Sequence, residues 1–188
     1  MQAFLISLST VAIAEVGDRT QLLSLMLAAR FRRPWPILAG VLCATLASHA
    51  VAAFVGQRLG RALTPQILDA AVGVSMIAMS LWTLKPDTLD EAATSGSQRG
   101  AFLATLISFF IAEIGDKTQI ATVALAAAYA NLPAVIAGTT TGMFLANAPV
   151  VFFGKAFSAR LPLKAIRYLA SALFLALGVF FLVRAFMR

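Results

Sequence analysis

Charged residues are scarce in this sequence. Only 12% of its 188 residues are charged, whereas 60% are hydrophobic. In ordinary soluble domains about a quarter of the residues are charged. The chain therefore has too little polar surface to cover a water-soluble globule of its size.

Cysteine and histidine are nearly absent, with one residue of each, Cys43 and His49. A lone cysteine excludes a framework of disulfides within the chain. Without a cysteine cluster or a pair of histidines, the chain also lacks the soft ligands that Zn²⁺ or Cu⁺ would favour. No Gly-x-x-x-x-Gly-Lys-(Ser/Thr) loop occurs, so ATP is not the direct energy source, and we expect no bound cofactor.

The net charge of +7 does not indicate a nucleic-acid-binding protein. The basic residues cluster in short gaps between apolar runs, as the charges that flank membrane spans do. We therefore expect a lipid bilayer and small ions as partners, and no nucleic acid.

Six long apolar segments predict an all-α integral membrane protein. A helix needs about 20 residues to cross the ~30 Å hydrocarbon core of a bilayer, and every segment is long enough. The first and the fourth are long enough to tilt. The predicted transmembrane helices are residues 3–29, 35–57, 66–84, 101–129, 133–155 and 166–186.

The sequence repeats itself with an offset of 98 positions. This shift aligns residues 14–21 with residues 112–119, and without a gap it also pairs Gly40 with Gly138. One offset that holds through glycines, acids and apolar residues alike is not a coincidence. The chain therefore contains two copies of one unit.

Each copy holds three predicted spans, an odd number, so the second copy enters the membrane in the opposite direction. We predict two inverted three-helix repeats, residues 1–85 and 100–188, joined by a polar connector at 86–99. Inverted repeats are typical of secondary transporters, whose substrate site lies near the midplane where the halves meet.

Loop charges predict the orientation in the membrane. Cytoplasmic loops carry an excess of lysine and arginine. The gaps after spans one, three and five hold nine basic residues, against four on the other side: Arg30, Arg32, Arg33, Lys85, Arg99, Lys155, Arg160, Lys164 and Arg167. We therefore expect the connector in the cytoplasm and both termini on the outer side of the plasma membrane.

Four of the eight acidic residues lie at equivalent positions in spans one and four: Glu15, Asp18, Glu113 and Asp116. A charge at the bilayer centre costs about 2.5–3.5 kcal/mol on insertion scales, so four such acids indicate a function. On a continuous helix, a glutamate and an aspartate three residues apart point to the same side. The inverted repeat would then bring two pairs of carboxylates face to face.

Arg19 and Lys117 follow the two glutamates by four residues, the favourable order for ion pairs with Glu15 and Glu113 on the same helix. If each base neutralises one carboxylate, two negative charges remain, which one divalent cation would balance. The four acids are therefore candidate metal ligands. The alternative is that these acids and bases are structural ion pairs that hold the helices together.

Hydroxyl and amide oxygens follow the acids in both motifs, and they are second-tier candidate ligands: Thr20, Gln21, Thr118 and Gln119. Together with carboxylates, such oxygens suit hard cations such as Mn²⁺, Ca²⁺ or Mg²⁺. Gly17 and Gly115 can loosen the helix, so that backbone carbonyls also face the ion.

His49 and Asn147 occupy equivalent places in spans two and five and are also second-tier candidates. His49 could accept protons, because the ordinary pKa of histidine lies near neutrality. The interpretation we favour is a buried neutral ring that makes one hydrogen bond between helices.

Residues 15–20 and 113–118 both read Glu-x-Gly-Asp-(Lys/Arg)-(Thr/Ser). In this motif the chain resembles the membrane family of Golgi manganese and calcium exchangers and bacterial MneA-type manganese exporters (uncharacterised protein family sixteen, in the calcium/cation antiporter-2 group). The resemblance covers essentially the whole chain. It implies cation–proton exchange, with Mn²⁺ the leading and Ca²⁺ the second substrate, and it implies that the glutamates and aspartates of both motifs bind the metal.

The predicted function is a secondary transporter that exports Mn²⁺ in exchange for protons, because metal and protons compete for the same carboxylates. A Ca²⁺/H⁺ exchanger is the first alternative, and a passive channel is another. An intramembrane enzyme could use paired carboxylates for acid–base chemistry. The duplication argues against an enzyme, since a catalytic centre needs no equivalent access from both faces.

Small-xxx-small spacing at Gly56/Gly60 and Gly138/Gly142 predicts close helix contacts, within the monomer or across a homodimer.

Overall fold

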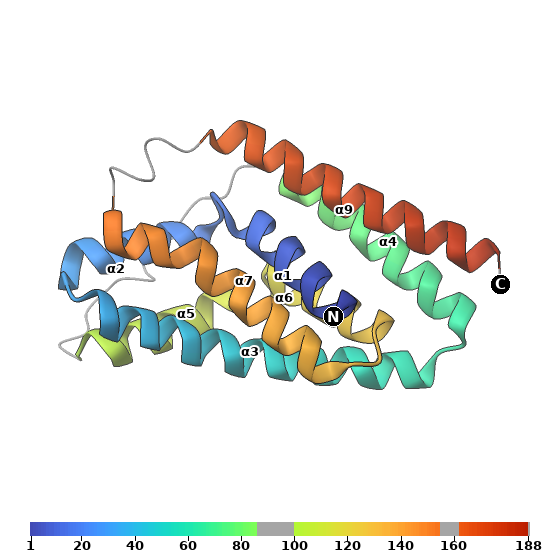
Figure 1. Ribbon diagram of the computed structural model, residues 1–188, viewed down its shortest axis with the longest axis horizontal. Coiled ribbons are helices and arrows are strands. Elements are labelled where there is room, and N and C mark those ends of the chain that lie inside the picture. The colour runs from blue at the N-terminus through green and yellow to red at the C-terminus, as the bar shows by residue number, and fades with distance from the viewer. Residues whose placement is uncertain (86–99, 155–161, 188) are drawn as a thin grey trace.

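The computed structural model describes residues 1–85, 100–154 and 162–187 of the chain. Within these ranges the protein consists of eight helices and contains no strand, in agreement with the predicted all-α fold. Figure 1 shows them as an elongated bundle in which most helices follow the long axis. The predicted connector at 86–99 lies outside the described residues, as do Lys155 and Arg160.

In the described parts of the chain, each half contributes four helices in the same order. Proline occupies the first position of α3 and of α4, where its fixed φ and its missing N–H are tolerated. The helices of the first half are α1 (Gln2–Glu15), α2 (Arg19–Phe31), α3 (Pro34–Ala62) and α4 (Pro65–Thr83). Those of the second half are α5 (Ala101–Glu113), α6 (Lys117–Ala128), α7 (Leu132–Phe153) and α9 (Leu163–Phe186).

The segments 3–29 and 101–129, predicted as continuous helices, are each broken at the motif. Gly17 and Gly115 have φ angles of 81° and 71°, a left-handed conformation that glycine adopts without steric cost and that ends a helix. The break lies between α1 and α2 in the first half and between α5 and α6 in the second half.

The breaks separate the two acids of each motif. The glutamate is the last residue of the first helix, and the aspartate is the N-cap of the next one. The prediction that both acids lie on one stripe of a continuous helix is therefore wrong.

Four helices, α3, α4, α7 and α9, are long and apolar enough to cross a membrane. The apolar helices α1 and α5 have 14 and 13 residues. At 1.5 Å per residue they span only about 20 Å, less than the ~30 Å of a bilayer core. Neither α1 nor α5 can therefore cross the core without the helix that follows it.

The two halves interlock. α1 packs against α7, α3 packs against α5 and α6, and α4 lies along α9 (Figure 1). Glycine allows these approaches: a Cβ at Gly138 of α7 would lie 2.5 Å from the carbonyl oxygen of Phe4 in α1, and one at Gly56 of α3 would overlap the backbone of Val123 in α6. The small-residue pairs thus serve contacts within the chain, and they supply no argument for a homodimer.

Polar side chains are buried in this bundle while large apolar side chains are exposed. The buried polar residues include Ser7, Thr10, Thr45, Ser48 and Thr122. The exposed apolar residues include Val51, Leu81, Ile111, Phe153 and Leu169. So many exposed large apolar side chains are unusual for a soluble monomer and suit contact with lipid.

Candidate metal centre

Three of the four predicted acids meet where the broken helices of the two halves come together. One carboxylate oxygen of each of Glu15, Asp18 and Asp116 lies within 4.8 Å of the others, and all three side chains are buried. We call this group the carboxylate cluster. It joins one glutamate and one aspartate of the first half to an aspartate of the second half.

Glu113 lies apart from the carboxylate cluster. Its carboxylate turns to α3, where Thr45 Oγ1 donates a hydrogen bond of 2.6 Å to Oε1 and Ser48 lies within hydrogen-bonding reach. The prediction that four carboxylates face one another therefore holds for three of them. The helix break explains the difference, because each acid can turn independently of the other.

Each aspartate pairs with the base of the opposite half. Lys117 Nζ lies 2.7 Å from Asp18 Oδ1, and Arg19 Nε lies 3.0 Å from Asp116 Oδ1. The predicted pairs of Arg19 with Glu15 and of Lys117 with Glu113 are therefore wrong. A pair between residues four apart needs a continuous helix, and the helix is interrupted between these residues.

Glu15 receives hydrogen bonds from both halves. Thr20 Oγ1 donates to Oε1, and Asn147 Nδ2 in α7 donates to the same oxygen at 3.0 Å. Ser24 Oγ donates to Asn147 Oδ1 at 2.6 Å and so orients the amide. The other oxygen, Oε2, is buried without a hydrogen-bond partner among the described residues. A buried acceptor in this condition is suited to a cation.

The glutamines that were second-tier candidates brace the two breaks. Gln21 Oε1 accepts a hydrogen bond of 2.8 Å from the backbone N–H of Gly17, and Gln119 Oε1 accepts an equal bond from Gly115. The Gln21 amide donates to the carbonyl of Ala146, and the Gln119 amide donates to Ser48 Oγ, each at 3.0 Å. Ala146 and Ser48 are themselves 98 positions apart, so the repeat extends to these contacts.

Of the remaining second-tier candidates, Thr118 contacts an acid of the carboxylate cluster, whereas His49 forms no hydrogen bond with a described residue. Asp116 is the N-cap of α6, and its Oδ2 accepts hydrogen bonds from the N–H and the hydroxyl of Thr118 at 3.2 Å and 3.0 Å. His49 is buried, and neither ring nitrogen has a hydrogen-bond partner within the described parts of the chain. The expected hydrogen bond between His49 and another helix is thus not formed.

The charges around the carboxylate cluster nearly cancel. Three ionised carboxylates and the two bases paired with them leave one negative charge, and an ionised Glu113 adds a second. The aspartates have basic partners, so the unbalanced charge belongs to the two glutamates. Buried oxygen ligands with two uncompensated charges are chemically suited to a hard divalent cation.

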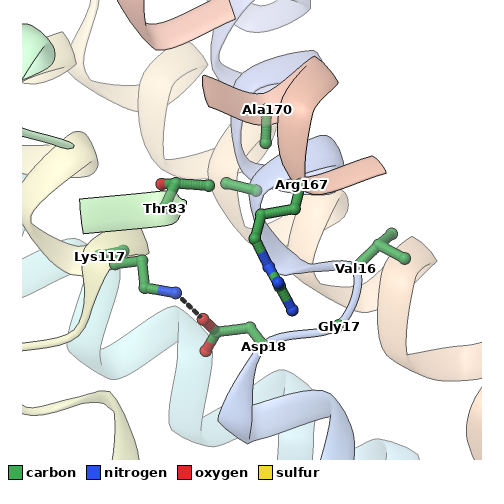
Figure 2. A pocket seen from close by; sticks show the side chains of 8 residues that line it. Val16, Gly17, Asp18, Thr83, Lys117, Arg167 and Ala170 are labelled. Atoms are coloured by element: carbon green, nitrogen blue, oxygen red, sulfur yellow. Dashed lines mark hydrogen bonds and ion pairs between the residues drawn. The ribbon is translucent and has the colours of Figure 1, made fainter. Parts of the chain in front are cut away.

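A small pocket adjoins Asp18 on the side of α4 and α9 (Figure 2). Its volume of about 10 Å³ is about the room that one water molecule needs. Lys117 lines it together with Asp18, and the guanidinium of Arg167 in α9 points toward the loop of Gly17 and Asp18 (Figure 2). The pocket therefore places a third basic side chain beside the carboxylate cluster.

Sequence reasoning missed four polar residues of this region: Ser24, Thr45, Ser48 and Arg167. Thr45, Ser48 and His49 fall on neighbouring positions of one apolar span, and this polar face was the available signal. Arg167 was assigned only to the loop charges. Its approach to the motif depends on how α9 packs, which no local pattern encodes.

Comparison with known proteins identifies relatives over the whole chain. A family model described as "Divalent cation/proton antiporter GDT1" matches residues 3–91 and 101–188. A Vibrio cholerae protein described as "Putative manganese exporter" is 52% identical over 95% of this chain and 90% of its own length. A GDT1-like protein of Synechocystis is 28% identical over 95% of this chain and 96% of its own.

A eukaryotic relative is more distant. The divalent cation/proton antiporter GDT1 of Saccharomyces cerevisiae is 24% identical over 99% of this chain and 85% of its own length. No solved structure matches the chain.

Proposed function

Since the chain belongs to the GDT1 family of divalent cation/proton antiporters, we propose that it exports Mn²⁺ across the plasma membrane in exchange for protons. Family membership makes it a membrane transporter and not an enzyme. This membership supports assigning the paired carboxylates to transport rather than to acid–base catalysis.

The observation that carries the proposal is the carboxylate cluster. It lies at two helix breaks, one from each half, and Glu15 presents a buried oxygen without a hydrogen-bond partner. In secondary transporters, discontinuous helices at the interface of two repeats form the ion site. We assign Glu15, Asp18 and Asp116 as ligands of the transported cation, and Glu113 as a ligand that joins from its place beside α3.

The topology we propose has six spans in two inverted repeats. α1 with α2, and α5 with α6, would each form one broken span, because α1 and α5 are too short alone. In Figure 1, α3 and α7 occupy equivalent places in the two halves and run in opposite directions, which supports inversion. Both termini would lie outside and the connector at 86–99 inside.

The choice of Mn²⁺ is supported by the bacterial relative whose description names a manganese exporter, with 52% identity. The oxygen-rich cluster accepts Ca²⁺ equally well on chemical grounds, so Ca²⁺/H⁺ exchange is the second candidate.

Coupling would arise from competition at the carboxylates. A metal ion binds carboxylates only after they lose their protons, so protons that enter from one side release metal carried from the other. Lys117 and Arg19 balance the aspartates while no metal is bound, which limits the cost of burying the acids.

Flux in proteoliposomes tests the proposal. Purified protein is reconstituted, a pH gradient is set, and Mn²⁺ and Ca²⁺ movement is followed with the membrane potential clamped. We expect the proton gradient to drive Mn²⁺ against its own concentration gradient. We also expect Mn²⁺ to move faster than Ca²⁺. Downhill movement alone would indicate a channel.

A further inference from the structure

The two halves carry different side chains at the position that contacts Glu15 in one of them. Asn147 in α7 donates to Glu15 at 3.0 Å. His49 occupies the equivalent place in α3, the helix that Glu113 contacts through Thr45. The first half thus has an imidazole at the position where the second half has an amide.

His49 lies on the face of α3 from which Thr45 contacts Glu113. Thr45 and His49 are four residues apart in one helix, so they share a face and are separated by about 6 Å along the axis. Thr45 Oγ1 donates a hydrogen bond of 2.6 Å to one oxygen of Glu113. Ser48, next to His49 in the sequence, is within hydrogen-bonding reach of the same carboxylate. The contact of Asn147 with Glu15 shows that a side chain at this position can reach the glutamate in the motif of the opposite half.

Both side chains are buried, and both have polar atoms without a hydrogen-bond partner among the described residues. Glu113 and His49 are 0% exposed, and Glu113 Oε2, His49 Nδ1 and His49 Nε2 have no hydrogen-bond partner within the described residues. A buried polar atom that forms no hydrogen bond has lost its hydration without compensation, and here three such atoms belong to Glu113 and His49. A metal ion between a carboxylate oxygen and an imidazole nitrogen would satisfy one atom of each.

We propose that Glu113, His49 and Thr45 form a second half-site for the transported cation, and that His49 makes this half-site prefer Mn²⁺ to Ca²⁺. The inference rests on the proposed function and names the residue that sets its selectivity. Imidazole nitrogen is a common ligand of transition-metal ions, whereas Ca²⁺ takes oxygen ligands. The carboxylate cluster offers only oxygens and does not discriminate in this way.

The test compares the transport of two cations by protein with and without the imidazole. Mn²⁺ and Ca²⁺ flux is measured in proteoliposomes for the wild type, His49→Asn and His49→Gln. The asparagine reproduces the amide that Asn147 supplies in the second half. We expect the apparent affinity for Mn²⁺ to fall about tenfold, while that for Ca²⁺ stays within about twofold. Ser7→Ala removes another buried, unpartnered polar group, in α1, and leaves the ratio of affinities unchanged.

The outcomes separate the two hypotheses. A wild type that moves neither ion against a proton gradient contradicts the proposed function. An active wild type whose Mn²⁺/Ca²⁺ ratio is the same in a His49 variant overturns only the second half-site.

A spectroscopic measurement needs no substitution. His49 is the only histidine of the chain, so in protein freed of any histidine tag, imidazole coupling in the pulsed electron paramagnetic resonance of bound Mn²⁺ must come from it. We expect this coupling at saturating Mn²⁺. Its absence overturns the assignment even where both His49 variants fail to fold.

Discussion

Asp18 and Asp116 each form an ion pair with a basic side chain, and the two basic side chains differ in their access to water. The side chain of Lys117, the partner of Asp18, is 3% exposed, whereas that of Arg19, the partner of Asp116, is 34% exposed. Removing one partner of a buried ion pair costs about 3–5 kcal/mol, because the other charge stays buried. The guanidinium of Arg19 can instead be hydrated by water.

We therefore expect Asp18→Asn to lower the thermal stability of the purified protein more than Asp116→Asn, while both variants lose Mn²⁺ transport. Thermal unfolding in detergent measures the first effect, and flux in proteoliposomes measures the second. Wild-type transport by either variant would show that the aspartates are not ligands.

The double variant Asp18→Asn/Lys117→Gln removes both charges of the buried pair. Because the charge of Lys117 is then no longer buried without Asp18, we expect the double variant to regain most of the stability lost in Asp18→Asn. Transport stays absent, since the carboxylate is still missing. Thermal unfolding of the two variants side by side checks the prediction, and equal melting temperatures would contradict it.

The helix breaks offer a comparison between two equivalent elements. A Cβ on Gly17 would meet Leu163 Cδ2 at 3.1 Å, whereas one on Gly115 would meet nothing within 4 Å. Both positions have positive φ, which costs a residue other than glycine about 1–2 kcal/mol. Gly17→Ala carries this strain and a steric contact, and Gly115→Ala carries only the strain.

We expect Gly17→Ala to reduce stability and Mn²⁺ flux more than Gly115→Ala. Leu163→Ala in the Gly17→Ala background removes the contact and should bring the double variant to the level of Gly115→Ala. Thermal unfolding and flux of the four variants provide the measurement. A larger defect in Gly115→Ala would show that packing against α9 is not what distinguishes the breaks.

The long elements could be predicted from hydropathy and proline. Residues 35–57 and 133–155 correspond to α3 and α7, with ends shifted by a few residues. The breaks could not be predicted in this way, because hydropathy reads composition and does not report φ. A local signal was present: glycine followed by aspartate and then a base and threonine is the sequence of a helix end and a new N-cap.

The carboxylate cluster was predictable in its residue types but not in its pairing. The repeat placed Glu15 and Asp116 in equivalent motifs, and burial of both is observed. Pairing Lys117 with Asp18 required the break and the packing of α6 against the first half, which are tertiary features. Tertiary packing also separates Glu113 from the other acids, because the end of α5 lies against α3, where Thr45 contacts Glu113.

Because the two halves interlock, labelling at the two ends of α3 can test the orientation of the whole molecule in the membrane. Arg33 and Thr64 are exposed at opposite ends of α3. In a Cys43→Ala background, we expect Thr64→Cys to react with impermeant thiol reagents in intact cells and Arg33→Cys to be shielded. The opposite result would reverse the proposed orientation and leave the inverted repeat unaffected.

Proton dependence is a property of the complete transport cycle. Metal must displace protons from the carboxylates, so its apparent affinity falls as pH falls, by up to about tenfold per pH unit for each proton displaced. We therefore expect Mn²⁺ affinity on the loading side to weaken at acid pH, and an inward proton gradient to accelerate efflux. Glu15→Gln should flatten this dependence as well as weaken binding, because it removes one site that metal and protons share. The measurement is Mn²⁺ flux against pH between about 5.5 and 8, in proteoliposomes with clamped membrane potential. Flux and affinity that do not change over this range would contradict proton exchange and indicate a uniporter or channel.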